Sequence, residues 1–423
     1  MQQFREKVID TMKFLLVHNH YNQKGGEDAI FKQEAELLRE AGHYVIEYRR
    51  SNDELKELGL QQKLKVPARL VWASDTVKEL RSLIQKEDPD VAHFHNTFMM
   101  ISPAAYYACH RAGVPVVQTL HNYRLLCPAA TFYRDGHVCE DCLGKTPPWP
   151  GVLHACYRSS RTQTAAVAAM LTFHRWLRTW NKKVDLYVAL TEFAKRKFVE
   201  GGLPEERIVV KPNFVHPDPG AQEKNDGYAL FVGRLSPEKG LKTLFKAWGS
   251  LKGMPLKIAG DGPLMSQIKE SAAEQKLNSI EILGNCSHEK VIALMKSARF
   301  LVFPSEWYEG FPVSIAEAFA CGKPVIASKL GAMAELIEDG KTGLLFEPGN
   351  SEDLARKVMH AFENPDLCRR MGLNARAEYE AKYTAKINYM KLMEIYDKVL
   401  TSKFPSPLSS PHRGEGRSEG GKG

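Results

Sequence analysis

Short apolar segments rich in β-branched and aromatic residues alternate along the chain with longer segments of helical period. In the first half, a helix is predicted at about residues 27–41, and strands are predicted at residues 14–17, 44–48, 91–95, 114–120 and 186–190. A second series of predicted strands comprises residues 229–232, 256–259, 280–283, 300–303 and 324–327. Strands separated by helices in this way form parallel βαβ units, so each half is predicted to hold a parallel sheet.

The stretch between the two series, residues 212–227, has the composition of a linker, with three prolines and two glycines. A chain of 423 residues also exceeds what one hydrophobic core usually fills. We therefore predict an α/β fold with two tandem Rossmann-like, doubly wound domains facing across a cleft. The predicted parts are a first domain at 12–212 with a Cys-rich insert at about 121–160, a linker at 213–227, a second domain at 228–382, a helix returning to the first domain at 383–401 and a disordered tail at 402–423. In such sheets ligands sit at the carboxyl ends of the strands, which places the site in the cleft.

The most informative segment of the second domain is residues 304–318, PSEWYEGFPVSIAEA. Glu309 falls in a loop after a predicted strand, and Glu317 falls eight residues later, about two turns into the next helix by its spacing. Between them, the free N–H groups near Val313 and Ser314 would form an anion site at the start of that helix. One carboxylate could hold sugar hydroxyls, the helix end a phosphate and the other carboxylate a ribose. This spacing fits a nucleotide sugar lying across the loop.

Two glycine-containing turns follow predicted strands and suit phosphate binding. Gly233 precedes Arg234, and Lys239 follows five residues later, so the two cations could converge on a diphosphate. In the first domain, Gly25 and Gly26 precede a predicted helix and would let backbone N–H groups approach a phosphate. For both turns the alternative is a solvated or purely geometric turn, and the residues alone leave it open.

Together these segments resemble the retaining glycosyltransferases of the family 4 type, which have the GT-B fold of two facing Rossmann-like domains. The resemblance covers about residues 13–400, and its most specific element is the pair Glu309 and Glu317 with the following Gly322-Lys323-Pro324. The supporting matches are Gly25-Gly26, Gly233-Arg234 with Lys239, residues 331–335 before 340–343, and Pro212-Asn213.

The resemblance implies a role for each matching residue. Arg234 and Lys239 would neutralise the donor pyrophosphate as the glycosyl bond breaks, without a metal ion. Glu309 would hold the sugar hydroxyls, Glu317 would hold the ribose, and the first-domain glycines would close over the leaving group. The implied donor contacts are Gly25, Gly26, Asn213, Gly233, Gly310, Phe311, Pro312, Val313, Ser314 and Glu317. The hinge near Asn213 would reorganise as the domains close.

His121 follows the predicted strand at 114–120 and is expected to face the cleft. Members of this family commonly carry a His-Asp pair near the reacting sugar, whereas this chain has His121-Asn122. The missing carboxylate puts an acid-base partnership in doubt, so His121 is assigned to contact with the donor or the acceptor. Retaining members are thought to react on one face of the sugar, with the leaving phosphate helping to take the acceptor proton.

Four of the eight cysteines, Cys127, Cys139, Cys142 and Cys156, lie in one stretch after His121. A C-x-x-C pair with two outer cysteines provides the ligand count of a tetrahedral zinc site, although the outer spacings are irregular. His137 and His154 are alternative ligands. Two interpretations stay open, a structural zinc that pins an acceptor-side loop and a set of free thiols.

The formal charge of +8 is modest for this length, and only residues 170–197 mix basic and aromatic side chains densely. We predict a solvated amphipathic helix there, with contact to an anionic membrane surface as the alternative. No apolar run approaches the ~20 residues of a spanning helix, and the N-terminus does not resemble a signal peptide. The expected location is the cytoplasm, with peripheral contact at the inner membrane face.

The sequence therefore predicts transfer of a sugar from a UDP- or GDP-sugar to a glycan or lipid-linked glycan, in cell-surface polysaccharide synthesis. Alternatives are a nucleotide-sugar epimerase, a non-catalytic sugar-nucleotide sensor and a nucleic-acid-binding zinc protein. The last leaves the second domain unexplained, so no nucleic-acid partner is expected. Asp88-Pro89-Asp90 has the letters of a metal-binding D-x-D motif, but it precedes a strand and is interpreted as a helix end.

Overall fold

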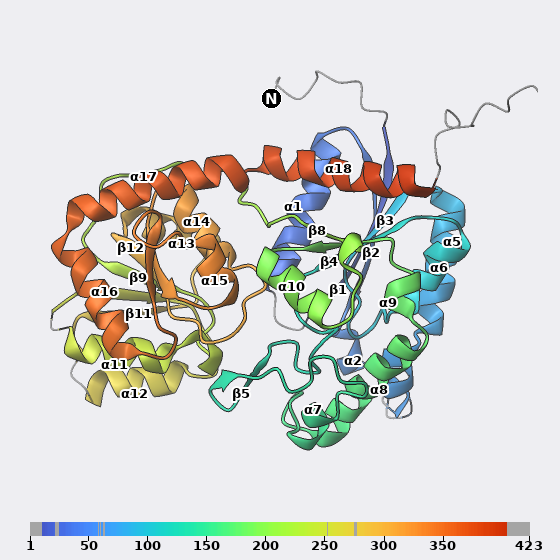
Figure 1. The fold of residues 1–423 in the computed structure, drawn as a ribbon, viewed down its shortest axis with the longest axis horizontal. Helices are drawn as coiled ribbons and strands as arrows, with labels where there is room; N and C mark the ends of the chain where they lie inside the picture. The colour runs from blue at the N-terminus through green and yellow to red at the C-terminus, as the bar shows by residue number, and fades with distance from the viewer. Residues whose placement is uncertain are drawn as a thin grey trace, which may run out of the picture.

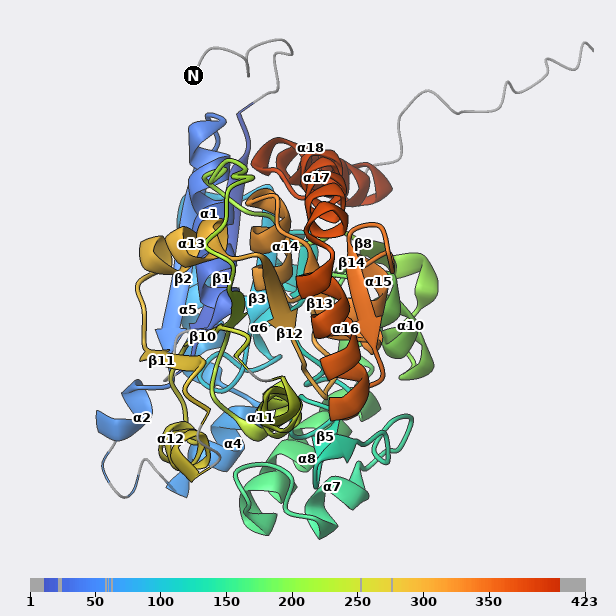
Figure 2. The ribbon, with the colours of Figure 1, turned by 90° about the vertical axis from the view of Figure 1, so that its left-hand side faces the viewer.

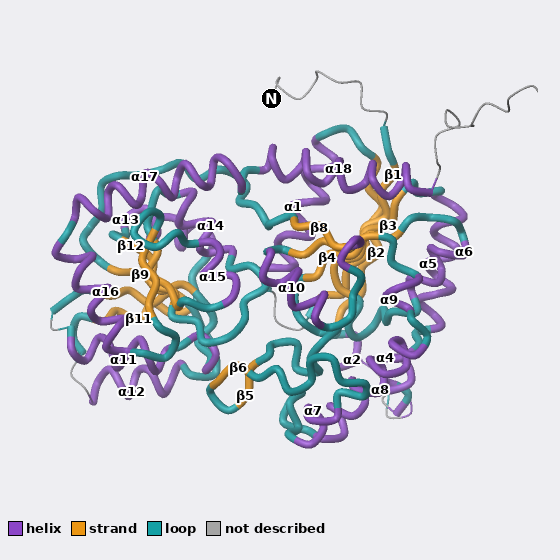
Figure 3. The backbone as a smooth tube through the Cα atoms, viewed as in Figure 1, coloured by secondary structure: helices purple, strands orange, loops and turns teal. Residues whose placement is uncertain are grey.

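The computed structural model describes residues 11–21, 25–57, 59, 61, 64–251, 253–274 and 277–403. They form two α/β domains that lie side by side, each with a six-stranded parallel sheet inside and helices outside (Figures 1 and 3). This is the predicted fold class. The predicted tail from residue 404 onward and the residues just before the first glycine pair, 22–24, lie outside the described residues. No helix in the described part of the chain is long and apolar enough to cross a membrane.

The first sheet has the strand order β2-β1-β3-β4-β7-β8. Its strands are β1 (Lys13–His20), β2 (Tyr44–Ser51), β3 (Val91–Asn96), β4 (Val116–Leu120), β7 (Leu186–Ala189) and β8 (Ile208–Val210). The helices of this domain are α1 (Gly26–Glu40), α2 (Glu54–Glu57), α4 (Val66–Val71), α5 (Ser74–Glu87), α6 (Ala105–Arg111), α8 (Arg161–Trp176), α9 (Thr179–Lys182) and α10 (Glu192–Glu200), with a 3₁₀ turn η1 (Glu205–Arg207). Alternate residues of β1 point to opposite layers: Phe14 and Leu16 pack in one cluster with α1, and Leu15 and Val17 in another with α5 and α6.

The second sheet has the strand order β11-β10-β9-β12-β13-β14. Its strands are β9 (Ala229–Val232), β10 (Leu256–Ala259), β11 (Ile280–Gly284), β12 (Phe300–Phe303), β13 (Val325–Ser328) and β14 (Gly343–Phe346). The helices are α11 (Leu241–Ser250), α12 (Met265–Glu274), α13 (His288–Ser297), α14 (Val313–Ala320), α15 (Gly331–Leu336) and α16 (Ser351–Glu363), with a 3₁₀ turn η2 (Pro237–Lys239). The inner strands β12 and β13 are buried on both faces, as expected of a parallel sheet between helical layers, whereas the edge strand β11 is partly exposed.

The last two helices join the domains. α17 (Pro365–Lys382) packs on the second domain, and α18 (Ala385–Lys403) continues along the same side of the molecule over the first (Figures 1 and 2). Tyr396 of α18 packs against Phe14 with ring centroids 4.5 Å apart, and its hydroxyl lies 2.8 Å from Nδ1 of His93. The chain passes between the domains twice, near Val215 and near Thr384, and these two segments run side by side because Val215 forms a β-bridge with Thr384. α18 is thus part of the core of the first domain.

An insert between β4 and α8 carries little regular structure, only a hairpin of β5 (Tyr133–Arg134) and β6 (His137–Val138) and the short helix α7 (Trp149–Leu153). The hairpin reaches the second domain: the Phe132 and Tyr308 ring centroids are 6.1 Å apart. Burial, with the nearby Glu306 carboxylate adding to it, raises the pKa of Tyr133 to about 12. The insert therefore borders the loop after β12 that carries Glu309.

One prediction about local structure is wrong. Residues 170–197 do not form a single amphipathic helix; the end of α8, α9, β7 and most of α10 divide the stretch. The reason is visible in the burial pattern, since Leu186–Ala189 are fully buried as a central strand and Trp180 is buried in the core. Only Phe173 and Trp176 of its aromatic residues remain exposed.

Candidate active site at the domain boundary

Glu309 lies in the loop after β12 and is held by three donors. Its Oε1 accepts hydrogen bonds from Lys239 Nζ at 2.7 Å, Ser305 Oγ at 2.6 Å and Trp307 Nε1 at 2.7 Å. The side chain is mostly buried, and among the described residues no hydrogen bond reaches its second oxygen, Oε2. Charge-assisted bonds of this kind fix the carboxylate in one orientation. The free oxygen can therefore accept a hydrogen bond from a ligand hydroxyl.

The contact between Lys239 and Glu309 depends on a close approach of two backbone turns. Gly240 has φ +69°, and a Cβ atom there would lie 1.8 Å from the carbonyl oxygen of Pro304. The Glu306 N–H also donates to the carbonyl of Glu238 at 2.8 Å. Only glycine permits both the left-handed backbone and this approach. The sequence thus brings a lysine and a carboxylate 70 positions apart into contact.

Arg234 and the start of α14 offer positive potential beside this pair. Arg234 is exposed just beyond the carboxyl end of β9, and its guanidinium has no hydrogen bond or ion pair among the described residues. Pro312 occupies the N-cap of α14 and supplies no capping side chain, so the first N–H groups at Val313 and Ser314 stay open to an anion. Together these groups can bind a phosphate-bearing ligand.

Glu317 lies on α14 but nearer its start than predicted. The helix begins at Val313, so Glu317 is one turn into it and not two, because the proline before Val313 delays the start. Its Oε1 lies 2.8 Å from Nε2 of His288, and this hydrogen bond raises the pKa of His288. Phe311, in the preceding loop, is buried against Tyr383.

The first domain faces this region across the domain boundary at several glycines. A Cβ atom at Gly310 would lie 2.5 Å from the carbonyl oxygen of His121, and one at Gly26 would lie 3.9 Å from Cγ2 of Val313. The Tyr123 hydroxyl donates to the backbone carbonyl of Glu309 at 3.3 Å. Gly26 thus lies against the open end of α14, while the exposed Gly25 has no such neighbour in the described part of the chain.

The half-buried His121 adjoins a row of fully buried histidines, His95 and His93. Its Nε2 lies 3.0 Å from Nδ1 of His95, and the two rings stack with centroids 5.2 Å apart. Burial holds the pKa of both rings well below the usual value, so His121 is neutral. No carboxylate is hydrogen-bonded to it among the described residues. Its neutral ring can accept or donate a hydrogen bond but provides no acid-base pair.

Glu27 is a further candidate site residue that the sequence analysis did not single out. It lies in the first turn of α1, where its carboxylate oxygens accept hydrogen bonds from Asn96 Nδ2 at 3.2 Å and Asn122 Nδ2 at 3.4 Å. Burial raises its pKa to about 8, and the neighbouring Asp28 carboxylate adds to the effect. The carboxyl thus lies beside Asn122, at the place where the family's aspartate is missing. Its position next to the glycine pair was the one signal that could have revealed it.

Two groups of side chains have the residue types of metal ligands, with ligand atoms within 4.8 Å of one another: His18, His20 and Asp28, and Glu34, His93 and His95. In the first, Asp28 Oδ1 already accepts from both histidines, at 2.8 and 2.7 Å. In the second, Glu34 forms a buried ion pair with Lys211 Nζ at 2.6 Å, and an ammonium group opposes a cation there. Both groups are therefore explained as internal polar networks.

The four cysteines of the insert are unpaired, and no three of their sulfur atoms lie within 4.8 Å of one another in the described structure. They are nonetheless neighbours. Burial raises the pKa of Cys142 to about 12, and the thiols of Cys127, Cys156 and Cys139 each add to that shift. The Gly151 N–H also donates to Cys142 Sγ at 3.2 Å. The thiols are grouped in one place but more widely than tetrahedral zinc ligands would be.

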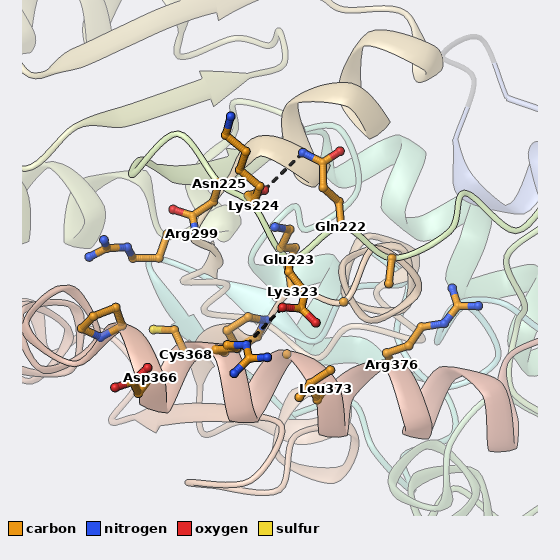
Figure 4. A pocket seen from close by; sticks show the side chains of 16 residues that line it. Gln222, Glu223, Lys224, Asn225, Arg299, Lys323, Asp366, Cys368, Leu373 and Arg376 are labelled. Carbon is orange, nitrogen blue, oxygen red and sulfur yellow. Dashed lines mark hydrogen bonds and ion pairs between the residues drawn. The ribbon is translucent and has the colours of Figure 1, made fainter.

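Several sequence motifs lie away from this region. Asp90, of the D-x-D letters, is at the amino end of β3 and accepts the Lys13 N–H at 2.7 Å. Gly322-Lys323-Pro324 precedes β13 and lines a cavity of about 370 Å³ between the linker and α17 (Figure 4). This is the amino end of the parallel strands, whereas Glu309 follows the carboxyl end of β12. Asn213 is buried after β8 with its Oδ1 unpartnered among the described residues. Among the described residues, no hydrogen bond or ion pair links any of these groups to the Glu309 side chain.

Comparison with known proteins places the chain among sugar transferases. Residues 24–219 match the family described as Glycosyltransferase Family 4, and residues 215–378 match Glycosyl transferases group 1. An uncharacterized glycosyltransferase of Methanocaldococcus jannaschii is 32% identical over 51% of this chain and 60% of its own. The D-rhamnosyltransferase WbpZ of Pseudomonas aeruginosa is 34% identical over 37% of this chain and 42% of its own. The chain thus spans about half the length of these curated relatives.

Solved structures agree on the fold. A glycosyltransferase from Rickettsia africae superposes with a TM-score of 0.67 at 20% identity, covering 93% of this chain and 99% of that one. HepE from Anabaena, solved in complex with UDP-glucose, gives a TM-score of 0.65 at 19% identity, with 92% of this chain and 100% of that one covered. The two adjoining family matches span residues 24–378, and the architecture is GT-B; the chain belongs to the family 4 type of GT-B glycosyltransferases.

Proposed function

We propose that this protein transfers a sugar from a UDP- or GDP-sugar to a glycan or lipid-linked glycan, with retention of configuration, during cell-surface polysaccharide synthesis. The observation that carries the proposal is the Glu309 carboxylate, fixed by Lys239 through Oε1 and open at Oε2. Next to it lie the unpaired Arg234 and the uncapped start of α14. A site with one fixed carboxylate and adjacent positive potential suits a ligand that has both hydroxyls and a diphosphate.

The charges are arranged to stabilise the departing diphosphate. As the glycosyl bond breaks, negative charge grows on the phosphate oxygen, and preorganised cations and N–H groups at that position lower the barrier. Arg234, Lys239 and the first turn of α14 would provide these groups, and no step in this scheme requires a metal ion. Glu309 would hold sugar hydroxyls through Oε2, and Glu317 would hold the ribose once released from His288.

The acceptor would approach from the first domain. His121 is neutral and lies against Gly310, so it would contact the sugar or the acceptor by hydrogen bonding. Glu27 and Asn122 lie beside it, and a carboxyl that is not paired with a cation could accept a hydrogen bond from an acceptor hydroxyl. The HepE structures contain UDP and UDP-glucose, which supports a nucleotide-sugar donor here. The cytoplasmic location stays a prediction.

Release of nucleotide diphosphate from a panel of UDP-, GDP- and ADP-sugars tests this function. We expect wild-type protein to release diphosphate from one sugar donor, and Arg234→Ala, which removes a hydrogen-bond donor to the leaving diphosphate, to lower the rate by roughly 10²–10³-fold. Glu309→Gln, which weakens the acceptor for the sugar hydroxyls, should lower the rate by a similar factor. Lys269→Ala, which removes an exposed cation from α12, is the matched control and should keep the wild-type rate. Isomerised donor without diphosphate release would show an epimerase, and donor binding with no release would indicate either a strict acceptor requirement or a sensor.

A further inference from the structure

Helix α7 of the insert and the adjoining α8 lie next to each other at the outside of the first domain (Figure 1), and large apolar side chains of both helices are exposed. This apolar surface consists of Trp149, Leu153, Phe173 and Trp176, whose side chains are 55, 53, 37 and 76% exposed. We call it the α7–α8 surface. Large apolar side chains grouped in this way on a folded domain mark a binding surface.

The α7–α8 surface is not an incompletely packed part of the core. The inner side of α8 packs fully in the core of the first domain through Val167, Met170 and Leu171. The outer side borders an open groove of about 520 Å³, lined by Pro147, Val152, Ala165, Ala168, Ala169, Thr172, Phe173 and Trp176. α8 is therefore apolar on its inner side and, from Ala165 to Trp176, along part of its outer side as well, and this second apolar stripe suits a second apolar partner.

The groove has almost nothing to offer a polar ligand. Among the eight lining residues just named, Thr172 alone carries a hydroxyl, and this hydroxyl already donates to the carbonyl of Ala168 at 2.7 Å. A glycan chain would need several hydrogen-bond partners in addition to aromatic rings, because buried hydroxyls without partners are costly. The lining instead fits hydrocarbon.

Positive charge predominates in the segment that carries the α7–α8 surface, although Asp141 at its start lies close enough to interact with Lys145. Residues 142–184 contain seven Lys and Arg residues and no Asp or Glu. In the described structure none of the seven forms an ion pair; they are Lys145, Arg158, Arg161, Arg175, Arg178, Lys182 and Lys183. Arg175 is used internally, since its guanidinium donates to the carbonyl of Leu125 at 2.8 Å. Aromatic side chains flanked by exposed cations are the combination that binds anionic bilayer surfaces.

The α7–α8 surface is connected to the acceptor side of the proposed site. Tyr157, which follows α7, donates to the Met99 sulfur at 3.6 Å, and its ring lies 5.1 Å from the Arg124 guanidinium carbon. The N–H of Arg124 in turn donates to Asn122 Oδ1 at 3.1 Å, and Asn122 contacts Glu27. A bilayer at α7 and α8 would thus lie on the side from which the acceptor approaches.

We propose that the α7–α8 surface docks the protein on an anionic lipid bilayer, with Trp149 and Trp176 at the interface and the surrounding cations on the lipid headgroups. The docking stands on this surface alone, whereas its use in presenting a lipid-linked acceptor rests on the proposed function. Each exposed cation near such a membrane contributes about fivefold to binding, so the interaction is lost at high salt.

Co-sedimentation with vesicles tests the docking. Full-length protein is mixed at low salt with vesicles of phosphatidylcholine and phosphatidylglycerol, or of phosphatidylcholine alone. We expect binding to the anionic vesicles, at least tenfold weaker binding to neutral ones and release by added salt. The double variant Trp149→Ser/Trp176→Ser should lose at least tenfold in partition coefficient, and Arg178→Gln/Lys182→Gln about 20-fold.

The matched control is Leu373→Ser/Met390→Ser, which removes two comparably exposed apolar side chains, 51 and 46% exposed, from α17 and α18. It should bind vesicles like the wild type. All variants should keep wild-type diphosphate release from a soluble donor, which separates this proposal from the proposed function. The docking is refuted if wild type does not sediment with anionic vesicles, if the tryptophan variant binds as well, or if the surface instead holds an acidic polysaccharide or a second protein copy.

Discussion

Glu27 provides a test of the site that is independent of turnover. Its carboxyl has a pKa of about 8 in the folded protein against 4.5 for the free side chain, because it is buried and lies next to Asp28. Below pH 4.5 both the folded and the unfolded chain hold the proton, and Glu27 does not affect stability. As the pH rises from 4.5 to about 8, only the folded chain keeps the proton, so the free energy of unfolding falls.

The size of this loss follows from the pKa difference. A difference of about 3.5 between the two states, at 1.36 kcal/mol for each, sets an upper limit of about 5 kcal/mol. Glu27 keeps part of its surface in water, which screens the charge, so we expect about 2–4 kcal/mol. Glu27→Gln keeps the neutral shape and removes the ionisation, and should therefore stabilise the protein above pH 8 and leave it unchanged near pH 4.5.

The measurement is urea unfolding of wild type and Glu27→Gln at pH 5 and pH 8.5, followed by circular dichroism. The midpoint of the variant should exceed that of wild type clearly at pH 8.5 and little at pH 5. Glu36→Gln, an exposed position on the same helix, is the control and should behave like wild type at both. Equal midpoints for Glu27→Gln and wild type at pH 8.5 would refute the environment described for this carboxyl. A group that costs stability at a binding surface is usually retained for function.

Two further predictions concern the first domain. Lys211→Met should lower the free energy of unfolding by about 3–5 kcal/mol, because it leaves the buried Glu34 carboxylate unpaired. Adding Glu34→Gln should restore most of the lost stability. Denaturant unfolding of the single and double variants measures both effects. If the insert holds a structural zinc, purified protein should contain one equivalent by elemental analysis and Cys142→Ser should lose it. Absence of zinc, with all eight thiols free when the protein is titrated after denaturation, would leave the free-thiol interpretation.

The fold could be predicted where single segments carry their own signal. The strands at 229–232, 256–259 and 300–303 lie at the predicted residues, because each is a short apolar run with polar neighbours. β8 and β14 were missed, since three residues of β8 give no periodicity and β14 starts with the glycine of a turn. The predicted helix over 170–197 failed because it overlapped the strand predicted at 186–190, which is present as β7, and because the letters do not show that Trp180 is buried in the core.

The candidate site also contains residues that a single segment of sequence can reveal and residues that it cannot. Glu309, Lys239 and Arg234 could be singled out as candidates because their motifs are continuous in sequence. The ion pair between Glu309 and Lys239 could not be predicted, since it depends on Gly240 meeting the carbonyl of Pro304 from another segment. Glu27 was missed for a related reason: its raised pKa comes from burial, and the amide that holds it comes from Asn122, 95 positions away.

Transfer of a labelled sugar tests the central claim most directly. The donor that supports diphosphate release would be given with label in its sugar, together with membrane lipids that carry oligosaccharide acceptors, and label would be measured in the organic and glycan fractions. We predict that wild type and Lys269→Ala move label into one of these fractions and that Glu309→Gln does so at least 100-fold more slowly. Label that stays in the aqueous phase as intact donor, or transfer that is as fast in Glu309→Gln as in wild type, would contradict the account.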